Sequence, residues 1–185
     1  MNKQIRDINI AKIQKLPAPA AYESSIPLSE TQSSFIFEGR QSIIDILSGK
    51  DDRLLAIVGP CSIHDVNAGI EYAKKLKKCS EKIASKILVL MRVYFEKPRT
   101  TIGWKGMIYD PHLNGSLDIE EGLKRARRFL SDVTNTGLLS ATEFVDPITP
   151  QYIADFVSWA AIGARTAESQ THRQMASGLS MPVGI

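Results

Sequence analysis

The stretch from Met91 to Gly106 contains several basic side chains and a single acidic one. The basic residues are Arg92, Lys97, Arg99 and Lys105. Arginine offers a planar set of donors that suits phosphate or carboxylate, and lysine offers a compact point charge. Pro98 restricts the backbone and Gly103 permits unusual angles, so the charges would lie on a shaped loop. The stretch therefore predicts a site for a small anion that carries several negative charges.

The alternative is a basic turn that only faces water, as runs of charge usually do. Directly before the loop, Ile87–Val93 is almost entirely apolar and predicts a strand. A rigid strand is a suitable support for a binding site, whereas solubility alone requires neither that support nor Pro98 and Gly103. These features favour the anion site.

Strand and helix patterns alternate from Leu54 onward. The predicted strands are 54–59, 87–93, 138–144, 160–164 and 181–185, and the predicted helices are 67–83, 118–137, 150–159 and 169–178. This alternation predicts parallel strands joined by crossover helices, in either an open doubly wound sheet or a barrel of eight strand–helix units. Neither G-x-G-x-x-G nor G-x-x-x-x-G-K-[ST] follows a predicted strand, which disfavours a nucleotide-binding open sheet.

The polar candidates share one position relative to these strands. Cys61 follows the first strand, Arg92 ends the second, Glu143 ends the third and Arg165 follows the fourth. Because the carboxyl ends of parallel strands meet at one edge, these residues are expected to converge on the catalytic face of a barrel. A surface arginine is the plainer interpretation of Arg165 taken alone.

The two cysteines are expected to differ. Cys61 follows Gly59-Pro60, a bend that could direct its thiol toward this edge, although buried cysteines are usually inert packing. Cys79 falls within a predicted helix, and packing is expected for it. Cys61 and His64 have Cys-x-x-His spacing, but no second ligand pair with such spacing occurs, which disfavours a structural zinc site.

Composition excludes some classes of function. With 185 residues, 43% of them hydrophobic, the chain can bury a core, and a net charge of +3 gives no reason to expect nucleic acid or membrane surfaces as partners. No run of about 18 apolar residues and no signal-peptide pattern occurs. A cytoplasmic location is expected.

Before Asp51, a short helix is expected near residues 5–13 and another at 38–47, with Gly49 after it.

Three stretches resemble the metal-dependent type I 3-deoxy-D-arabino-heptulosonate 7-phosphate synthases. They are GPCSIHD at 59–65, MRVYFEKPRTTIGWKG at 91–106 and SWAAIGARTAESQTHRQMASGLSMPVG at 158–184. The resemblance implies an α/β fold, the (β/α)8 TIM barrel, here reduced to about the first five strands. Residues 1–50 would form an N-terminal extension with oligomer or regulatory contacts, and residues 51–185 an incomplete barrel domain. The implied reaction condenses phosphoenolpyruvate with erythrose 4-phosphate, the first step of the shikimate pathway to aromatic amino acids.

The resemblance also implies roles for individual residues. Cys61 would bind a divalent metal ion of the Mn, Fe, Co or Zn class, and His64 would not be a ligand. The implied phosphoenolpyruvate site is Arg92, Glu143, Gly163, Ala164 and Arg165. The implied erythrose 4-phosphate site is Lys97, Pro98, Arg99 and Thr100, with Lys97 also catalytic. An aromatic amino acid would inhibit by binding near Asp146, Pro147, Pro150, Gln151 and Ser180, and the complete protein would be a homo-oligomer.

The chain ends at Ile185, whereas a barrel of eight units typically needs roughly 250 residues. The histidine, glutamate and aspartate that complete the family's metal site would lie beyond this point. The chain is therefore expected to be an inactive fragment of the synthase. Two alternatives remain: a module that binds an anion or amino acid without catalysis, and a product that does not fold stably.

Overall fold

The computed structural model describes residues 5–10 and 12–185. Its helices are α1 (Pro19–Ser25), α2 (Glu30–Leu47), α3 (Val66–Ile83), α4 (Ile119–Asn135), α5 (Pro150–Ile153) and α6 (Gln170–Gly178). Its strands are β1 (Leu54–Val58), β2 (Ile87–Arg92), β3 (Leu139–Glu143), β4 (Trp159–Ala161) and β5 (Val183–Gly184). Two short 3-10 turns, η1 (Ala154–Phe156) and η2 (Ala164–Thr166), flank β4.

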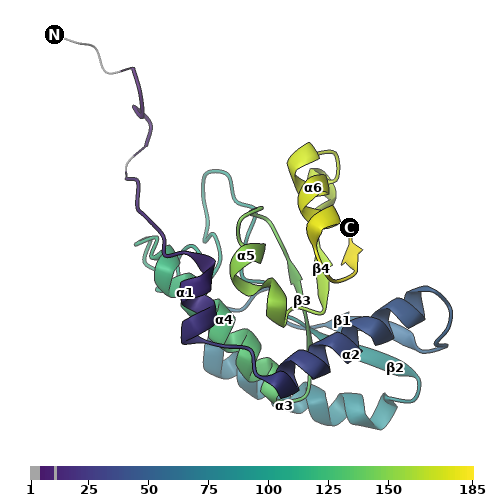
Figure 1. Ribbon diagram of the computed structural model, residues 1–185. Coiled ribbons are helices and arrows are strands. Elements are labelled where there is room, and N and C mark those ends of the chain that lie inside the picture. Colours follow the sequence, from purple (N-terminus) through teal and green to yellow (C-terminus); the bar gives the residue numbers. More distant parts are fainter. Residues whose placement is uncertain (1–4, 11) are drawn as a thin grey trace.

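The five strands form one sheet in which every neighbouring pair is parallel. Their order is β1-β2-β3-β4-β5, the same as their order along the chain (Figure 1). A doubly wound sheet reverses its strand order at a switch point, and this sheet does not. The structure therefore selects the barrel alternative: the sheet is a curled half of a (β/α)8 barrel.

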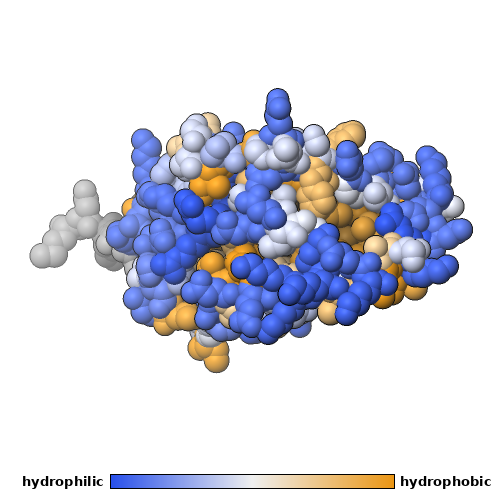
Figure 2. Space-filling model, turned by 90° about the horizontal axis from the view of Figure 1, so that it is seen from below, coloured by the Kyte–Doolittle hydropathy of each residue, from blue (hydrophilic) through white to orange (hydrophobic). Residues whose placement is uncertain are grey.

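Helices α3 and α4 lie together on one side of the sheet. Each begins at an aspartate whose side chain accepts a backbone N–H: Asp65 from Ala68, and Asp118 from Glu121. The buried face of α4 includes Phe129, whose ring packs edge-on against Phe95 at 5.9 Å. Seen from the side of these helices, hydrophilic residues cover most of the surface and hydrophobic areas are separate (Figure 2). The amphipathic pattern of α3 and α4 thus places their apolar stripes on the sheet.

Helix α2 packs against the opposite side of the sheet. Its Ile43 is fully buried in a second cluster with Leu90, Leu139 and Ala141. The helix begins earlier than the predicted residue 38, because Ser29 and Gln32 form a reciprocal capping box. Helix α2 thus contacts the sheet directly. The division of the chain at residue 50 into an N-terminal extension and a barrel domain stays a prediction.

Other predicted elements also needed correction. The short helix expected near residues 5–13 is wrong for the described residues 5–10 and 12–13; Ala11 lies outside the described residues. Ile5 and Ile13 remain 92% and 75% exposed, and a short helix without packing is only marginally stable. The helix predicted for 150–159 ends at Ile153 and is followed by the turn η1, and Trp159 already belongs to β4, which pairs with β3. Cys79 is exposed on α3, so the expectation of packing was wrong.

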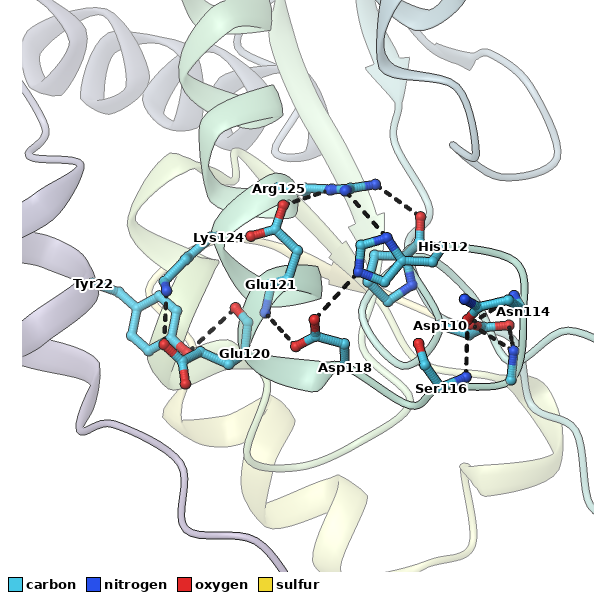
Figure 3. A network of polar contacts seen from close by, with 12 residues as sticks. Tyr22, Asp110, His112, Asn114, Ser116, Asp118, Glu120, Glu121, Lys124 and Arg125 are labelled. Atoms are coloured by element: carbon cyan, nitrogen blue, oxygen red, sulfur yellow. Dashed lines mark hydrogen bonds and ion pairs between the residues drawn. The ribbon is translucent and has the colours of Figure 1, made fainter.

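A long loop joins β2 to α4, and its second half is held by polar side chains (Figure 3). Arg125 donates to the Glu121 carboxylate at 2.7 Å and to the Pro111 carbonyl at 2.8 Å. The carboxylate of Asp110 accepts the backbone N–H groups of Asn114 and Gly115. These contacts hold the second half of the loop against α4. The first half is thus attached at both ends, to β2 before it and to this ordered second half after it.

Candidate functional site

The carboxyl ends of β1 and β2 bring Cys61 and Lys97 into contact. The Lys97 ammonium donates to the Cys61 sulfur at 2.9 Å and to the Cys61 carbonyl at 3.0 Å. Nη2 of Arg92 lies 3.4 Å from the same carbonyl. Residues far apart in the sequence thus meet at the rim of the sheet, as the strand pattern predicted.

The positive charges at this rim act on the thiol of Cys61. The hydrogen bond and the charge of Lys97 lower the pKa of Cys61 below its ordinary value, and the charges of Arg92 and Arg99 act in the same direction. The thiol is exposed. A lower pKa increases the fraction of thiolate, which is the nucleophilic and metal-binding form of cysteine.

Arg92 has an unsatisfied donor within the described part of the chain. Its guanidinium lies 3.9 Å from the centre of the Tyr94 ring, while its Nε is buried without a hydrogen-bond partner there. A buried donor without an acceptor costs free energy, so a ligand that placed an acceptor beside Nε of Arg92 would bind favourably there. The orientation of Arg92 therefore suits an anion.

A second part of the rim is a cleft of about 310 Å³ between the ends of β3 and β4. It is lined by Pro98, Glu143, Val145, Gly163, Ala164, Arg165 and Thr166. A Cβ at position 163 would lie 3.2 Å from Oε1 of Glu143, so any larger residue would narrow the cleft. The structure thus brings Pro98 from the loop after β2 to the residues that follow β3 and β4.

The remaining predicted substrate residues lie farther out on the loop after β2. We call residues 97–105 the cation loop. Arg99 and Thr100 are exposed on it and are not among the residues that line the cleft. Gly103 has φ of 96°, as its predicted role in shaping the loop required. The loop therefore presents Arg99 to solvent beside the rim.

The predicted inhibitor residues fall into two groups. Pro150, Gln151 and Ser180 line another cleft of about 310 Å³, together with Glu23, Arg40, Ala154, Asp155, Gly178, Leu179 and Met181. Asp146 and Pro147 do not line it. The Asp146 carboxylate accepts the Tyr109 hydroxyl at 3.0 Å and the Ile148 N–H at 2.7 Å, and Pro147 is exposed.

One buried group was not assigned a role from the sequence. Glu96 is only 2% exposed and accepts hydrogen bonds from the segment that follows β3. The sequence offered one signal of a special role for Glu96, namely that it is the single acidic residue in a cationic stretch. Its burial depends on donors about fifty positions away, which no local pattern specifies.

A divalent metal bound at Cys61 would need further His, Cys, Asp or Glu ligands beside it. Among residues 5–10 and 12–185, no group of three or more His, Cys, Asp or Glu side chains could hold a metal ion. The chemistry of Cys61 suits one ligand position, but a single thiolate does not define a coordination site. The described residues therefore do not form a metal site by themselves.

Comparison with known proteins gives one consistent family. Residues 25–185 match the DAHP synthetase I family. The Tyr-sensitive phospho-2-dehydro-3-deoxyheptonate aldolase of Escherichia coli is 52% identical over 181 residues, which is 98% of this chain and 51% of the relative. The Phe-sensitive enzyme of the same organism is 52% identical over 185 residues, which is 100% of this chain and 53% of the relative.

A solved structure agrees with these sequence relatives. Phospho-2-dehydro-3-deoxyheptonate aldolase from Francisella tularensis SCHU S4 superimposes with a TM-score of 0.92 at 55% identity. The match covers 95% of this chain and 52% of that chain. The chain thus spans about half the length of the relatives that it matches.

Proposed function

The chain belongs to the DAHP synthetase I family, and we propose that it supplies the first half of a 3-deoxy-7-phosphoheptulonate synthase. The complete enzyme would condense phosphoenolpyruvate with erythrose 4-phosphate and water, giving 3-deoxy-D-arabino-heptulosonate 7-phosphate and phosphate. The observation that supports this most is the meeting of Arg92, Lys97 and the cleft after β3 and β4 at one edge of the sheet. Both substrates are phosphorylated, and this edge is rich in cations.

The residues of this half would bind and orient the two substrates. Arg92 and Arg165, with the small residues Gly163 and Ala164, would hold the carboxylate and phosphate of phosphoenolpyruvate. The cation loop, with Lys97, Pro98, Arg99 and Thr100, would hold the phosphate of erythrose 4-phosphate. Positioned charges of this kind lower the barrier by stabilising charge that develops in the transition state. Lys97 would be the catalytic residue of the loop, since it also contacts Cys61.

We also propose that Cys61 contributes one ligand to a metal site that the rest of the full-length protein completes. A divalent metal bound there would polarise the aldehyde carbonyl. Lys97, which lowers the pKa of the Cys61 thiol, would favour the ionised form that metals bind.

The test uses a full-length chimera, in which the remaining half of the Francisella tularensis relative follows residue 185. We expect it to consume phosphoenolpyruvate only when erythrose 4-phosphate is present, and to release phosphate in equal amount. Lys97→Gln should abolish turnover, and Lys86→Gln, on the opposite end of β2, should not. Binding of either phosphorylated substrate without turnover would reject the enzyme and favour a module that only binds anions.

Regulation and assembly are further parts of the proposal. The cleft with Pro150, Gln151 and Ser180 would bind an aromatic amino acid, since charged Glu23, Arg40 and Asp155 also line it. The exposed isoleucines of the N-terminal segment would serve contacts between copies in a homo-oligomer.

Among the described residues no helix is long and apolar enough to cross a membrane. A cytoplasmic location is proposed.

A further inference from the structure

Glu96 is a buried carboxyl group directly before the cation loop. Its side chain is 2% exposed, whereas the loop residues that follow from Pro98 to Gly103 are exposed. A carboxylate is rarely buried unless its oxygens accept hydrogen bonds, because its desolvation is costly. The partners of Glu96 therefore show what its burial connects.

Three of these partners belong to one segment after β3. The Glu96 carboxylate accepts the backbone N–H groups of Val145 and Asp146, both at 3.1 Å, and the Thr149 hydroxyl at 3.2 Å. A fourth partner, the Tyr109 hydroxyl, lies 3.4 Å away and also donates to Asp146 at 3.0 Å. Glu96 thus connects the loop after β2 to the loop after β3.

Backbone contacts extend this connection to the cation loop. The N–H of Lys97 donates to the Lys105 carbonyl at 2.9 Å, which closes the loop at its base. The N–H of Arg99 donates to the Lys97 carbonyl at 2.8 Å. Because Glu96 is adjacent to this base, its position determines where Lys97 and Arg99 project.

We propose that Glu96 is a positioning residue, which fastens the base of the cation loop to the segment 145–149 and so presents Lys97 and Arg99 to an anionic ligand. Naming that ligand as erythrose 4-phosphate rests on the proposed function. Glu96 does not contact the thiol and does not itself line the cleft; it reaches the cleft only through the backbone N–H of Val145. It therefore acts through other residues and is not a catalytic residue.

Proton binding to Glu96 should change the strength of this fastening. Burial raises its pKa from 4.5 to about 7, opposed by the N–H groups of Val145 and Asp146 and reinforced by the charge of Asp146. Titratable groups at this position are Tyr109 and Asp146, and His172 of α6 contacts the carbonyl of Val145 at 3.0 Å. If the base of the cation loop separated from segment 145–149, Glu96 would be hydrated and its pKa would be near its ordinary value. The attached form of the loop therefore binds the proton more tightly than the separated form. A rise in pH from 4.5 to about 7 favours separation of the loop from segment 145–149.

The direct test is hydrogen exchange of the Lys97 and Arg99 amides in the full-length chimera, corrected for the intrinsic rate at each pH. Glu96→Ala leaves the donors of segment 145–149 unpaired and should speed exchange by about tenfold or more. Glu96→Gln keeps the shape without the titration, so its protection should not vary with pH in this window. Thr149→Val, which removes one donor, should give a smaller increase. The control is Glu71→Gln, which alters an exposed pair with Lys75 on α3.

Kinetics separate this inference from the proposed function. Glu96→Ala should raise the KM for erythrose 4-phosphate more than that for phosphoenolpyruvate. If the chimera is inactive but the exchange results hold, the proposed function is wrong and the role of Glu96 stands. Unchanged protection in both Glu96→Ala and Thr149→Val would reject the role of Glu96, whatever the activity.

Discussion

The two arginines assigned to different substrates occupy different parts of the rim. Both side chains are exposed, Arg99 on the cation loop and Arg165 at the lining of the cleft between β3 and β4. In the full-length chimera, Arg99→Ala should weaken erythrose 4-phosphate more than phosphoenolpyruvate, and Arg165→Ala should do the reverse. Loss of a charged phosphate contact costs about 2 kcal/mol. The Michaelis constants of both variants decide this; equal changes for the two substrates would reject the separate assignments.

Cys61 provides a test with a matched control in the same chain. Cys61→Ala in the chimera should reduce both bound divalent metal and turnover, because it removes one thiolate ligand. Cys79→Ala should change neither, since Cys79 is exposed on α3 away from the rim. Metal analysis of the purified proteins and initial rates measure the two effects. Full activity of Cys61→Ala in the presence of a chelator would contradict the assignment.

At the scale of elements, Arg127 joins α4 to two other parts of the fold. Its guanidinium, 1% exposed, donates to the Ile26 carbonyl, the Tyr152 carbonyl and the Asp155 carboxylate. It also lies 4.8 Å from the centre of the Phe156 ring. Through these contacts α4 holds both the segment after α1 and the helix whose residues line the proposed inhibitor cleft.

Removing this arginine should destabilise the fold strongly. Arg127→Ala should lower the free energy of unfolding of the chimera by about 3 kcal/mol, because it leaves a half-buried carboxylate and two carbonyls without their donor. The neighbouring Arg128 is exposed, so Arg128→Ala should change it by less than about 0.5 kcal/mol. Urea unfolding measures both; similar midpoints for the two variants would show that the buried contacts contribute little.

At the scale of the whole molecule, the sheet has two open edges. Strand β1 and strand β5 each pair with only one neighbour within the described chain. Leu54 on β1 is 69% exposed and Ile185 beyond β5 is 80% exposed. Unpaired edges with apolar side chains promote association between chains.

Residues 1–185 expressed alone should therefore associate or aggregate, and should show no synthase activity. Apolar surface that stays exposed loses roughly 25 cal/mol of stabilisation per Å². A few hundred Å² of such surface therefore offsets a large part of a typical net stability of about 5–15 kcal/mol. Sedimentation and urea unfolding of the 185-residue chain, with the full-length chimera as reference, measure this. A monodisperse monomer with one cooperative transition would show that the open edges are tolerated.

The sequence by itself determined the features that depend on neighbouring residues. Capping by Asp118, the end of α4 just before Gly137 and the alternation of strands and helices all follow from local rules. The position of Cys61, Arg92 and Glu143 at strand ends followed from that alternation, because parallel strands place their carboxyl ends together.

Only the tertiary structure decided which of similar residues became buried, and with what partners. Helix α4 contains Arg125, Arg127 and Arg128, whose side chains are chemically alike. Arg125 pairs with Glu121, Arg128 is exposed, and Arg127 is buried. Spacing from Leu123 places Arg127 on the buried face, but the acceptors that make its burial stable come from segments far along the chain. The same holds for Glu96, because a buried charge is stable only where distant parts of the fold supply its hydrogen bonds.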